Sequence, residues 1–381
     1  MAMLELLLAL MPLSAATITL HDPSDDVDLQ TDVADNALTA NWNYTPTLYQ
    51  VDAITGAYEY TNEIATISHA TLSETANDTS VVVFTESSSV NISSSKVVKH
   101  GYSSDLYQAS FFGLNAAGTY VSITHSRLYS SGPVSHSLYA GDYGTIVGRN
   151  LRHYSGGYRS SAFAGDSPQG YVYVYDSIAH TAEVGSAIIY GQATVKAENV
   201  AGYAERAPIA FLDSATVRIA HSNLTAGLLA GVVTFSSDAR TADSEVTVTD
   251  SRMTVLPADA PALWFGNVVA SAALTRTTSD TASNILIVAN YSQVTQDFSY
   301  FAASTAPADA TVTVAQSDLR GDLVAYDGSA VRWALGNVYA AGFTLYYDGN
   351  ATANAWFGGK TVSLARGGQV TPASEQQLTG K

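Results

Sequence analysis

Short runs of alternating apolar and polar residues recur along the chain, each closed by a polar pair and an aliphatic residue. The phrase reads SVNISSSKV (89–97), YVSITHSRL (120–128), YVYVYDSI (171–178), TVRIAHSNL (216–224) and EVTVTDSRM (245–253). A second phrase lies between successive copies, as in HSLYAGDYG (136–144), SSAFAGDSP (160–168) and SAIIYGQA (186–193). Because the runs are too short for helices and alternate with period two, they predict two β-strands per repeat.

The repeats return mostly every 22 to 31 residues when their closing aliphatic residues are aligned, as at Leu128, Leu151, Ile178, Val200 and Leu224. A period of this length is typical of a solenoid. Alternation places Val, Ile and Leu inside and polar residues outside, so each turn buries its apolar face only against its neighbours. We therefore predict an all-β parallel β-helix of about ten to eleven rungs with capped ends, about 50 Å long.

Four segments are expected along the chain. Residues 1–16 resemble a signal peptide, although Glu5 and the absence of a basic start also fit an ordinary N-terminal capping helix. Residues 17–60 are expected to form an N-terminal cap, residues 61–340 the β-helix, and residues 341–381 closing strands and a tail. An insertion around 296–310 is expected to be a surface loop or, alternatively, a lid or groove wall.

Charge and composition exclude several function classes. The chain has 34 acidic and 17 basic residues and a net charge of -17, which opposes binding to nucleic acid and to anionic membranes. It has no apolar run of about 20 residues, the length of a membrane span, and no cysteine for disulfides or metal sites. Six sequons for N-glycosylation fit a secreted protein: Asn43, Asn77, Asn91, Asn223, Asn290 and Asn350.

Three phrases, SFFGLNAA (110–117), HSLYAGDYGTIVGRNL (136–151) and VGSAIIYG (184–191), resemble secreted right-handed parallel β-helix proteins of fungi and bacteria. The likeness covers roughly residues 60 to 340. It implies a right-handed solenoid and a secreted or cell-surface location, among adhesin-like and carbohydrate-binding proteins. It transfers no catalytic residue, and the motifs of pectate lyases and polygalacturonases do not occur in this chain.

A functional site in a β-helix is a column of side chains across turns. Counted from the aligned aliphatic residues, His153 and His180 take one position on consecutive turns, so we expect their imidazoles about 5 Å apart on one face. The candidate catalytic residues are His153, His180, Arg159, Tyr158 and Glu183. The candidate binding residues are Tyr129, His136, Arg152, Tyr154, Tyr203, Glu205 and Arg206.

This column allows two interpretations. A histidine or tyrosine could remove the proton α to a uronate carboxylate while an arginine neutralises the enolate, which is the chemistry of a polysaccharide lyase or epimerase. The alternative is that stacked aromatic and polar side chains only stabilise the sheet.

A second column is formed by carboxylates. Asp142 and Asp166 lie 24 residues apart in the matched phrases YAGD and FAGD, and Asp213 follows at a similar position. Carboxylates on adjacent turns could bind Ca²⁺ or act as a glycosidase pair. Gly-Asp after a strand is more often turn chemistry, in which the aspartate bonds its own backbone.

The chain also contains 23 tyrosines, and exposed tyrosines provide flat surfaces that stack on sugar rings. The sequence therefore favours a secreted carbohydrate-binding or surface-adhesion protein whose partner is a polysaccharide or cell-wall glycan. The alternatives are a polysaccharide-active enzyme, with a lyase or epimerase favoured over a glycoside hydrolase, and a structural component of a cell wall or spore surface.

Overall fold

The computed structural model describes residues 55–103, 114–165, 170–236, 243–258, 260–266 and 268–281, followed by segments 284–289, 309–315, 317–319, 322–325, 330–336, 343–347, 350–355, 362–365 and 369–372. Several sequence-based expectations lie outside these residues: the signal peptide (1–16), residues 17–54 of the cap, Asp166, and residues 296–308 of the insertion.

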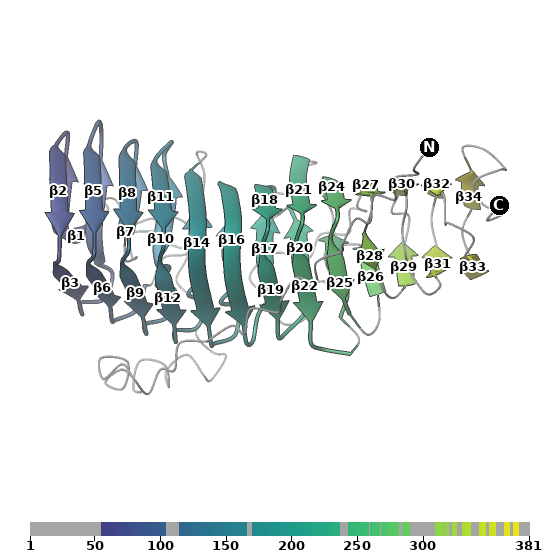
Figure 1. Ribbon diagram of the computed structural model, residues 1–381, viewed down its shortest axis with the longest axis horizontal. Coiled ribbons are helices and arrows are strands. Elements are labelled where there is room, and N and C mark those ends of the chain that lie inside the picture. Colours follow the sequence, from purple (N-terminus) through teal and green to yellow (C-terminus); the bar gives the residue numbers. More distant parts are fainter. Residues whose placement is uncertain are drawn as a thin grey trace, which may run out of the picture.

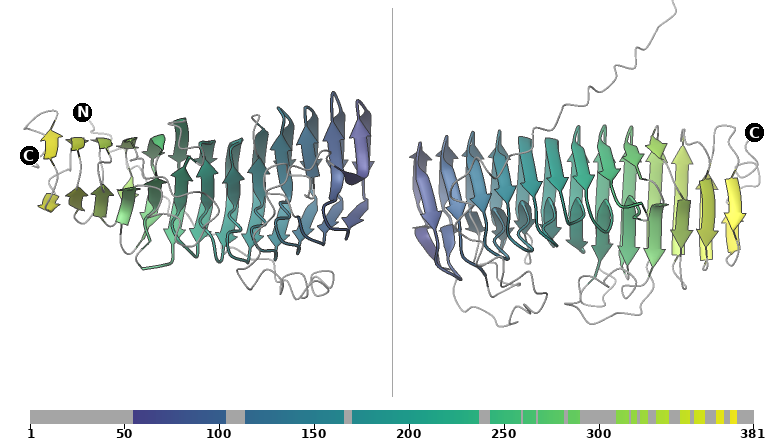
Figure 2. Two further views of the ribbon diagram at one scale, coloured as in Figure 1. Left: turned by 180° about the vertical axis from the view of Figure 1, so that it is seen from behind. Right: turned by 90° about the horizontal axis from the view of Figure 1, so that it is seen from below.

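The described chain is a parallel β-solenoid whose strands are stacked side by side along one long axis (Figures 1 and 2). Within the described residues, one sheet contains 13 strands and the other contains 21. The larger sheet comprises two rows of strands. The two rows form one sheet because β14 and β16 run through both of them. The predicted fold class is therefore confirmed. No helix in the described residues is long and apolar enough to cross a membrane.

The 13-stranded sheet comprises β1 (Gly56–Thr61), β4 (Ser80–Thr85), β7 (Leu114–Ala117), β10 (Leu138–Gly141), β13 (Phe163–Gly165), β15 (Ile189–Gly191), β17 (Ala210–Asp213), β20 (Val232–Phe235), β23 (Leu263–Gly266), β26 (Asn284–Ala289), β29 (Asp322–Ala325), β31 (Phe343–Tyr347) and β33 (Val362–Ala365).

The first row of the 21-stranded sheet comprises β2 (Ile64–Ser68), β5 (Ser89–Ser93), β8 (Tyr120–Thr124), β11 (Thr145–Arg149), β14 (Tyr171–Thr181), β16 (Thr194–Ala204), β18 (Thr216–Ala220), β21 (Asp243–Thr249), β24 (Val269–Thr275), β27 (Asp309–Ala315), β30 (Ala330–Gly336), β32 (Asn350–Ala355) and β34 (Gln369–Pro372). The second row continues β14 and β16 and adds β3 (Thr71–Glu74), β6 (Lys96–Lys99), β9 (Arg127–Ser130), β12 (Arg152–Ser155), β19 (Asn223–Ala226), β22 (Arg252–Val255), β25 (Thr278–Asp280) and β28 (Asp318–Leu319).

The chain bends between the two rows at one residue per turn, which we call the corner residue. Its backbone is left-handed, with φ between 48° and 54°, a conformation that asparagine, aspartate and histidine adopt more readily than most other non-glycine residues. The corner residues are His69, Ser94, His125, Asn150, Asp176, Asn199, His221, Asp250 and Arg276. The next residue is often a buried serine whose hydroxyl accepts a backbone N–H of the preceding turn, as Ser222 does from Val200 at 3.0 Å.

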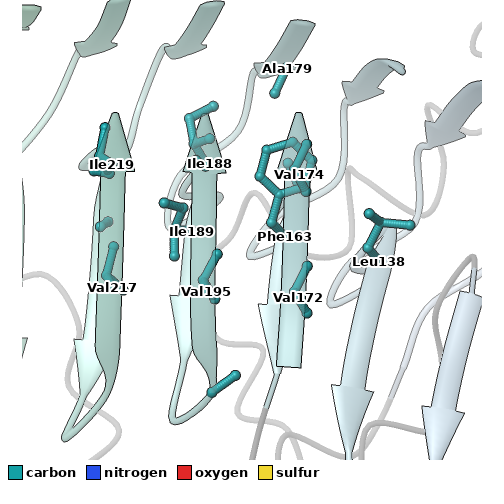
Figure 3. Close-up of a cluster of buried hydrophobic side chains, with 14 of the residues drawn as sticks. Leu138, Phe163, Val172, Val174, Ala179, Ile188, Ile189, Val195, Val217 and Ile219 are labelled. Carbon is teal, nitrogen blue, oxygen red and sulfur yellow. The ribbon is translucent and has the colours of Figure 1, made fainter. Parts of the chain in front are cut away.

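The interior is filled by the apolar side chains that alternation predicts. Val172 and Val174 from β14 face Phe163 and Leu138 from the 13-stranded sheet, and all four are fully buried (Figure 3). Val195, Val217 and Ile219 repeat the arrangement on the following turns (Figure 3). Each turn thus packs on the turns beside it, which leaves the outward positions available for surface chemistry.

Candidate functional site

The strand register separates the two histidines that the sequence placed together. His153 of β12 pairs with Ala179, whereas His180 of β14 pairs with Tyr154. Because successive side chains point to opposite faces, His153 faces the interior and His180 faces outward. His153 is 1% exposed, and its ring centroid lies 6.3 Å from that of Phe163. The expected pair of imidazoles on one face is therefore wrong, because alignment on Leu151 and Ile178 was one residue out of register.

His180 belongs to an outer aromatic column in the second row, formed in register by Tyr129, Tyr154, His180 and Tyr203. The ring of His180 meets Tyr154 edge-on at 5.1 Å and stacks on Tyr203 at 5.6 Å. Its Nε2 lies 2.6 Å from Oε1 of Glu205. Burial raises the pKa of Tyr203, and the neighbouring Glu205 carboxylate adds to this effect.

Most of this aromatic column is covered. Tyr129 is 5% exposed, Tyr154 is 6% exposed and His180 is 3% exposed. The expectation that Tyr129 and Tyr154 offer exposed rings to a ligand is wrong, because both rings pack with Val98 in one buried cluster. Tyr203 and Glu205 remain half-buried.

The other candidates of this region lie on loops that stack from turn to turn. The backbone N–H of Val134 donates to the carbonyl of Tyr158 at 2.7 Å, and the N–H of Arg159 donates to the carbonyl of Val184 at 3.0 Å. Tyr158 is buried, and the Arg159 guanidinium carbon lies 5.1 Å from its ring centroid. Glu183 and Arg206 form a surface ion pair at 2.9 Å.

His136 lies in a different aromatic group, beside the 13-stranded sheet. Its ring stacks on Tyr190 at 5.0 Å and on Tyr139 at 6.4 Å, and its Nδ1 accepts the backbone N–H of Ser161 at 2.9 Å. Burial lowers the pKa of His136 to about 3. A neutral, enclosed imidazole of this kind supports the structure and is not open to a polymer.

The strands that precede Asp142 and Asp166 do not have the register that the sequence match assumed. β10 pairs with β13 so that Leu138 lies opposite Phe163, a spacing of 25 residues, whereas matching Asp142 to Asp166 required 24. Asp142 is exposed and its backbone is left-handed, with φ of 47°. Asp213 accepts a hydrogen bond from the Gln192 side chain at 2.9 Å. The described residues contain no group of three or more His, Cys, Asp or Glu side chains placed to hold a metal ion.

Three tyrosines that the sequence analysis did not select occupy the outer face of β14. Tyr171, Tyr173 and Tyr175 alternate with the buried Val172 and Val174, so their rings point away from the interior and are half-buried on the surface. The rings of Tyr171 and Tyr173 lie 6.4 Å apart. The signal was present in the phrase YVYVY, because an alternating strand with valine inside must place tyrosine outside.

Two cations sit over the last of these tyrosines. The guanidinium carbon of Arg149 lies 4.0 Å from the Tyr175 ring centroid, and Nζ of Lys196 lies 5.1 Å from it. Lys196 also pairs with Glu198 at 2.7 Å. Burial raises the pKa of Tyr173, with smaller contributions from the neighbouring Tyr171 and Tyr175. We call Tyr171, Tyr173 and Tyr175 the tyrosine patch.

A groove of ≈ 800 Å³ begins beside the tyrosine patch and crosses five turns at the corners of the solenoid. One wall is formed by the corner residues of these turns, four of which are bonded in pairs. Asn199 donates to Asp176 at 2.7 Å, and Arg276 makes a two-point contact with Asp250 at 2.5 and 2.7 Å. The hydrogen bonds from Arg276 lower the pKa of Asp250. The groove therefore presents amide and hydroxyl groups, the ion-paired Asp250 and Arg276, and the amide-bonded carboxylate of Asp176.

No protein-family model, curated protein or solved structure matches this chain. The chemistry of its surface is therefore the basis for assigning a function.

Proposed function

We propose that the protein binds extended glycans on the outer face of its solenoid and acts as a secreted surface-adhesion protein. The tyrosine patch carries this proposal. Half-buried, outward tyrosine rings offer an apolar face to a sugar ring and a hydroxyl to its oxygen atoms. The cations over Tyr175 and the amides of the adjoining groove add hydrogen-bond donors along the same surface.

The geometry also favours a chain-like ligand over a small one. The groove passes from the turn of Asp176 to the turn of Arg276, and every turn contributes a hydrogen-bonding side chain at the corner. A polysaccharide that lies parallel to the long axis meets one such group at each turn. Small ligands are usually enclosed on most of their surface, which this open groove does not provide.

A Tyr173→Ala, Tyr175→Ala double variant tests the proposal. We expect its affinity for a glycan that the native protein binds to fall about 10-fold or more, because single aromatic contacts contribute about 0.5 to 1.5 kcal/mol each. Binding is measured by isothermal titration after screening a panel of neutral and uronic-acid polysaccharides. Tyr143→Ala is the matched control, because Tyr143 is 65% exposed but lies on the turn before β11, outside the patch. Equal affinities of all three proteins would refute the proposed site.

The lyase or epimerase alternative required His153 and His180 to face one substrate together. Since His153 faces the interior and His180 is covered, no described observation favours that chemistry, and we propose no reaction. Incubation with uronic-acid polymers, followed by ultraviolet absorbance for unsaturated products, checks this directly.

A further inference from the structure

One outward column of the first row alternates between large apolar and small hydroxyl side chains. The column begins on β2 and follows the strand register through β5, β8, β11, β14 and β16, which Figure 1 shows side by side from the purple end. Its members are Ile64, Ser89, Tyr120, Thr145, Tyr171 and Thr194, and we call them the alternating column. Because paired strands lie about 4.8 Å apart, side chains of one kind recur about every 9.6 Å along the long axis.

The large side chains of this column face solvent. Ile64 is 91% exposed, Tyr120 is 47% exposed, and Tyr171 is half-buried on the outer face of β14. The core is filled by their neighbours in the strands, such as Val121 and Val172, which are fully buried. The three large side chains therefore lie outside the core, and a bound partner would remove their apolar surface from water.

The surface around the column suits a neutral ligand. None of the six side chains of the alternating column carries a charge at neutral pH. The outward column beside it is also uncharged on its first four turns, where it contains Thr66, Asn91, Ser122 and Val147. Along the alternating column itself, the first charged residue is Glu245, two turns beyond Thr194, where the alternation has already ended.

From this alternation we propose that the column binds a neutral, β-1,4-linked polysaccharide that lies parallel to the long axis. Such a chain is a straight ribbon in which successive sugar rings are turned over, so the same ring face recurs at every second sugar. Two sugar residues are comparable in length to two turns of the solenoid. This inference rests on the proposed function and specifies its ligand, because Tyr171 belongs to the tyrosine patch.

The two kinds of side chain have different roles in this arrangement. Every second sugar places an apolar ring face on Ile64, Tyr120 or Tyr171. The sugars between them lie over Ser89 and Thr145, whose hydroxyl groups can both donate to and accept from sugar hydroxyls. A glycan without a two-sugar repeat would gain equally from a stacking residue on every turn, and an α-1,4-linked chain curves away from a straight column.

The test exchanges two residues of the column without changing its composition. A Tyr120→Thr, Thr145→Tyr double variant keeps the number of aromatic rings but places two of them on adjacent turns, because residue 145 pairs with Tyr171. Tyr120→Ala removes one ring outright. Leu256→Ala is the control, because Leu256 is 55% exposed but follows β22 in the second row. Unfolding curves check that all three variants are folded.

Cellohexaose and N-acetylchitohexaose are the β-1,4-linked probes, and maltohexaose is the α-1,4-linked probe, each measured by isothermal titration. We expect the native protein and Leu256→Ala to bind at least one β-1,4-linked hexamer about 10-fold more tightly than maltohexaose. Both column variants should bind that hexamer about 3- to 10-fold more weakly, the effect of losing one aromatic contact. Native binding should also strengthen from the trimer, which spans Tyr120 to Tyr171, to the pentamer, which reaches Ile64.

The outcomes separate the two proposals. Preference for cellohexaose alone identifies the unsubstituted glucan as the ligand, and preference for N-acetylchitohexaose alone identifies the acetamido sugar. Equal binding of maltohexaose, or native affinity in the exchanged variant, overturns the alternating column. Glycan binding that depends on Tyr173 and Tyr175 but not on Tyr120 also overturns the column and leaves the proposed function intact. No binding to any glycan overturns both.

Discussion

Acidification from pH 7 to pH 4 is expected to destabilise the folded protein by roughly 3 kcal/mol through His136 alone. The pKa of His136 is about 3 in the folded protein and near 6.5 in the unfolded chain, so the unfolded chain binds the proton first. The stabilising contribution of the neutral imidazole is complete above pH 6.5 and decreases as the pH falls towards 3. Tyr139 and Tyr190 enclose the ring, and Nδ1 already accepts the Ser161 N–H.

Urea unfolding at pH 7 and pH 4 measures this effect in the native protein and in a His136→Gln variant. The variant is expected to be less stable at pH 7, because the stacked ring is lost, but its stability should change less between the two pH values. The difference between the two pH dependences isolates His136 from the other seven histidines of the chain. If both proteins lose the same free energy of unfolding, His136 is not the acid-sensitive group.

Gly157→Ala is expected to destabilise the protein by about 3 kcal/mol or more, the upper range for overpacking in a closely packed site. A Cβ on Gly157 would lie 2.0 Å from the carbonyl oxygen of Gly132 on the preceding turn. Gly132 makes a similarly close approach to Gly101 one turn earlier. At both positions the atoms nearest to an added Cβ are backbone atoms of the preceding turn. The loops of the two turns must therefore move apart to accommodate an alanine.

The adjacent Gly156→Ala is the matched control. A Cβ there would meet the Tyr154 ring at 3.4 Å, an ordinary contact, so we expect a change within about 1 kcal/mol. Thermal and urea unfolding of both variants measure the difference. Similar stabilities would show that the loops can separate without cost.

The fold could be predicted from the sequence because its signal is repeated on every turn. Val172 and Val174 alternate with tyrosines, and equivalent runs recur along the chain, so one misread turn leaves the prediction intact. The outward tyrosine patch followed from the same alternation and could have been recognised in YVYVY.

The candidate site could not be predicted in the same way, because it depends on register to a single residue. A shift by one residue moves a side chain to the opposite face of a sheet. Alignment on aliphatic residues placed Leu151 beside Leu128, whereas the structure places His153 opposite Leu128. The corner residues, such as His125 and Asn150, are the better alignment marks, because their backbone conformation ends one row on every turn.

The corner residues also bear on how such a protein can evolve. The corner requires a left-handed backbone, and its nine described examples use histidine, serine, asparagine, aspartate and arginine. A corner side chain that is not bonded to the next turn can therefore be exchanged with a modest local cost and no change in the register of the neighbouring turns. The pairs Asp176–Asn199 and Asp250–Arg276 instead link adjacent turns, so their chemistry must change together. The solenoid is in this respect a modular scaffold, whose units of surface diversification are single turns or bonded pairs of turns.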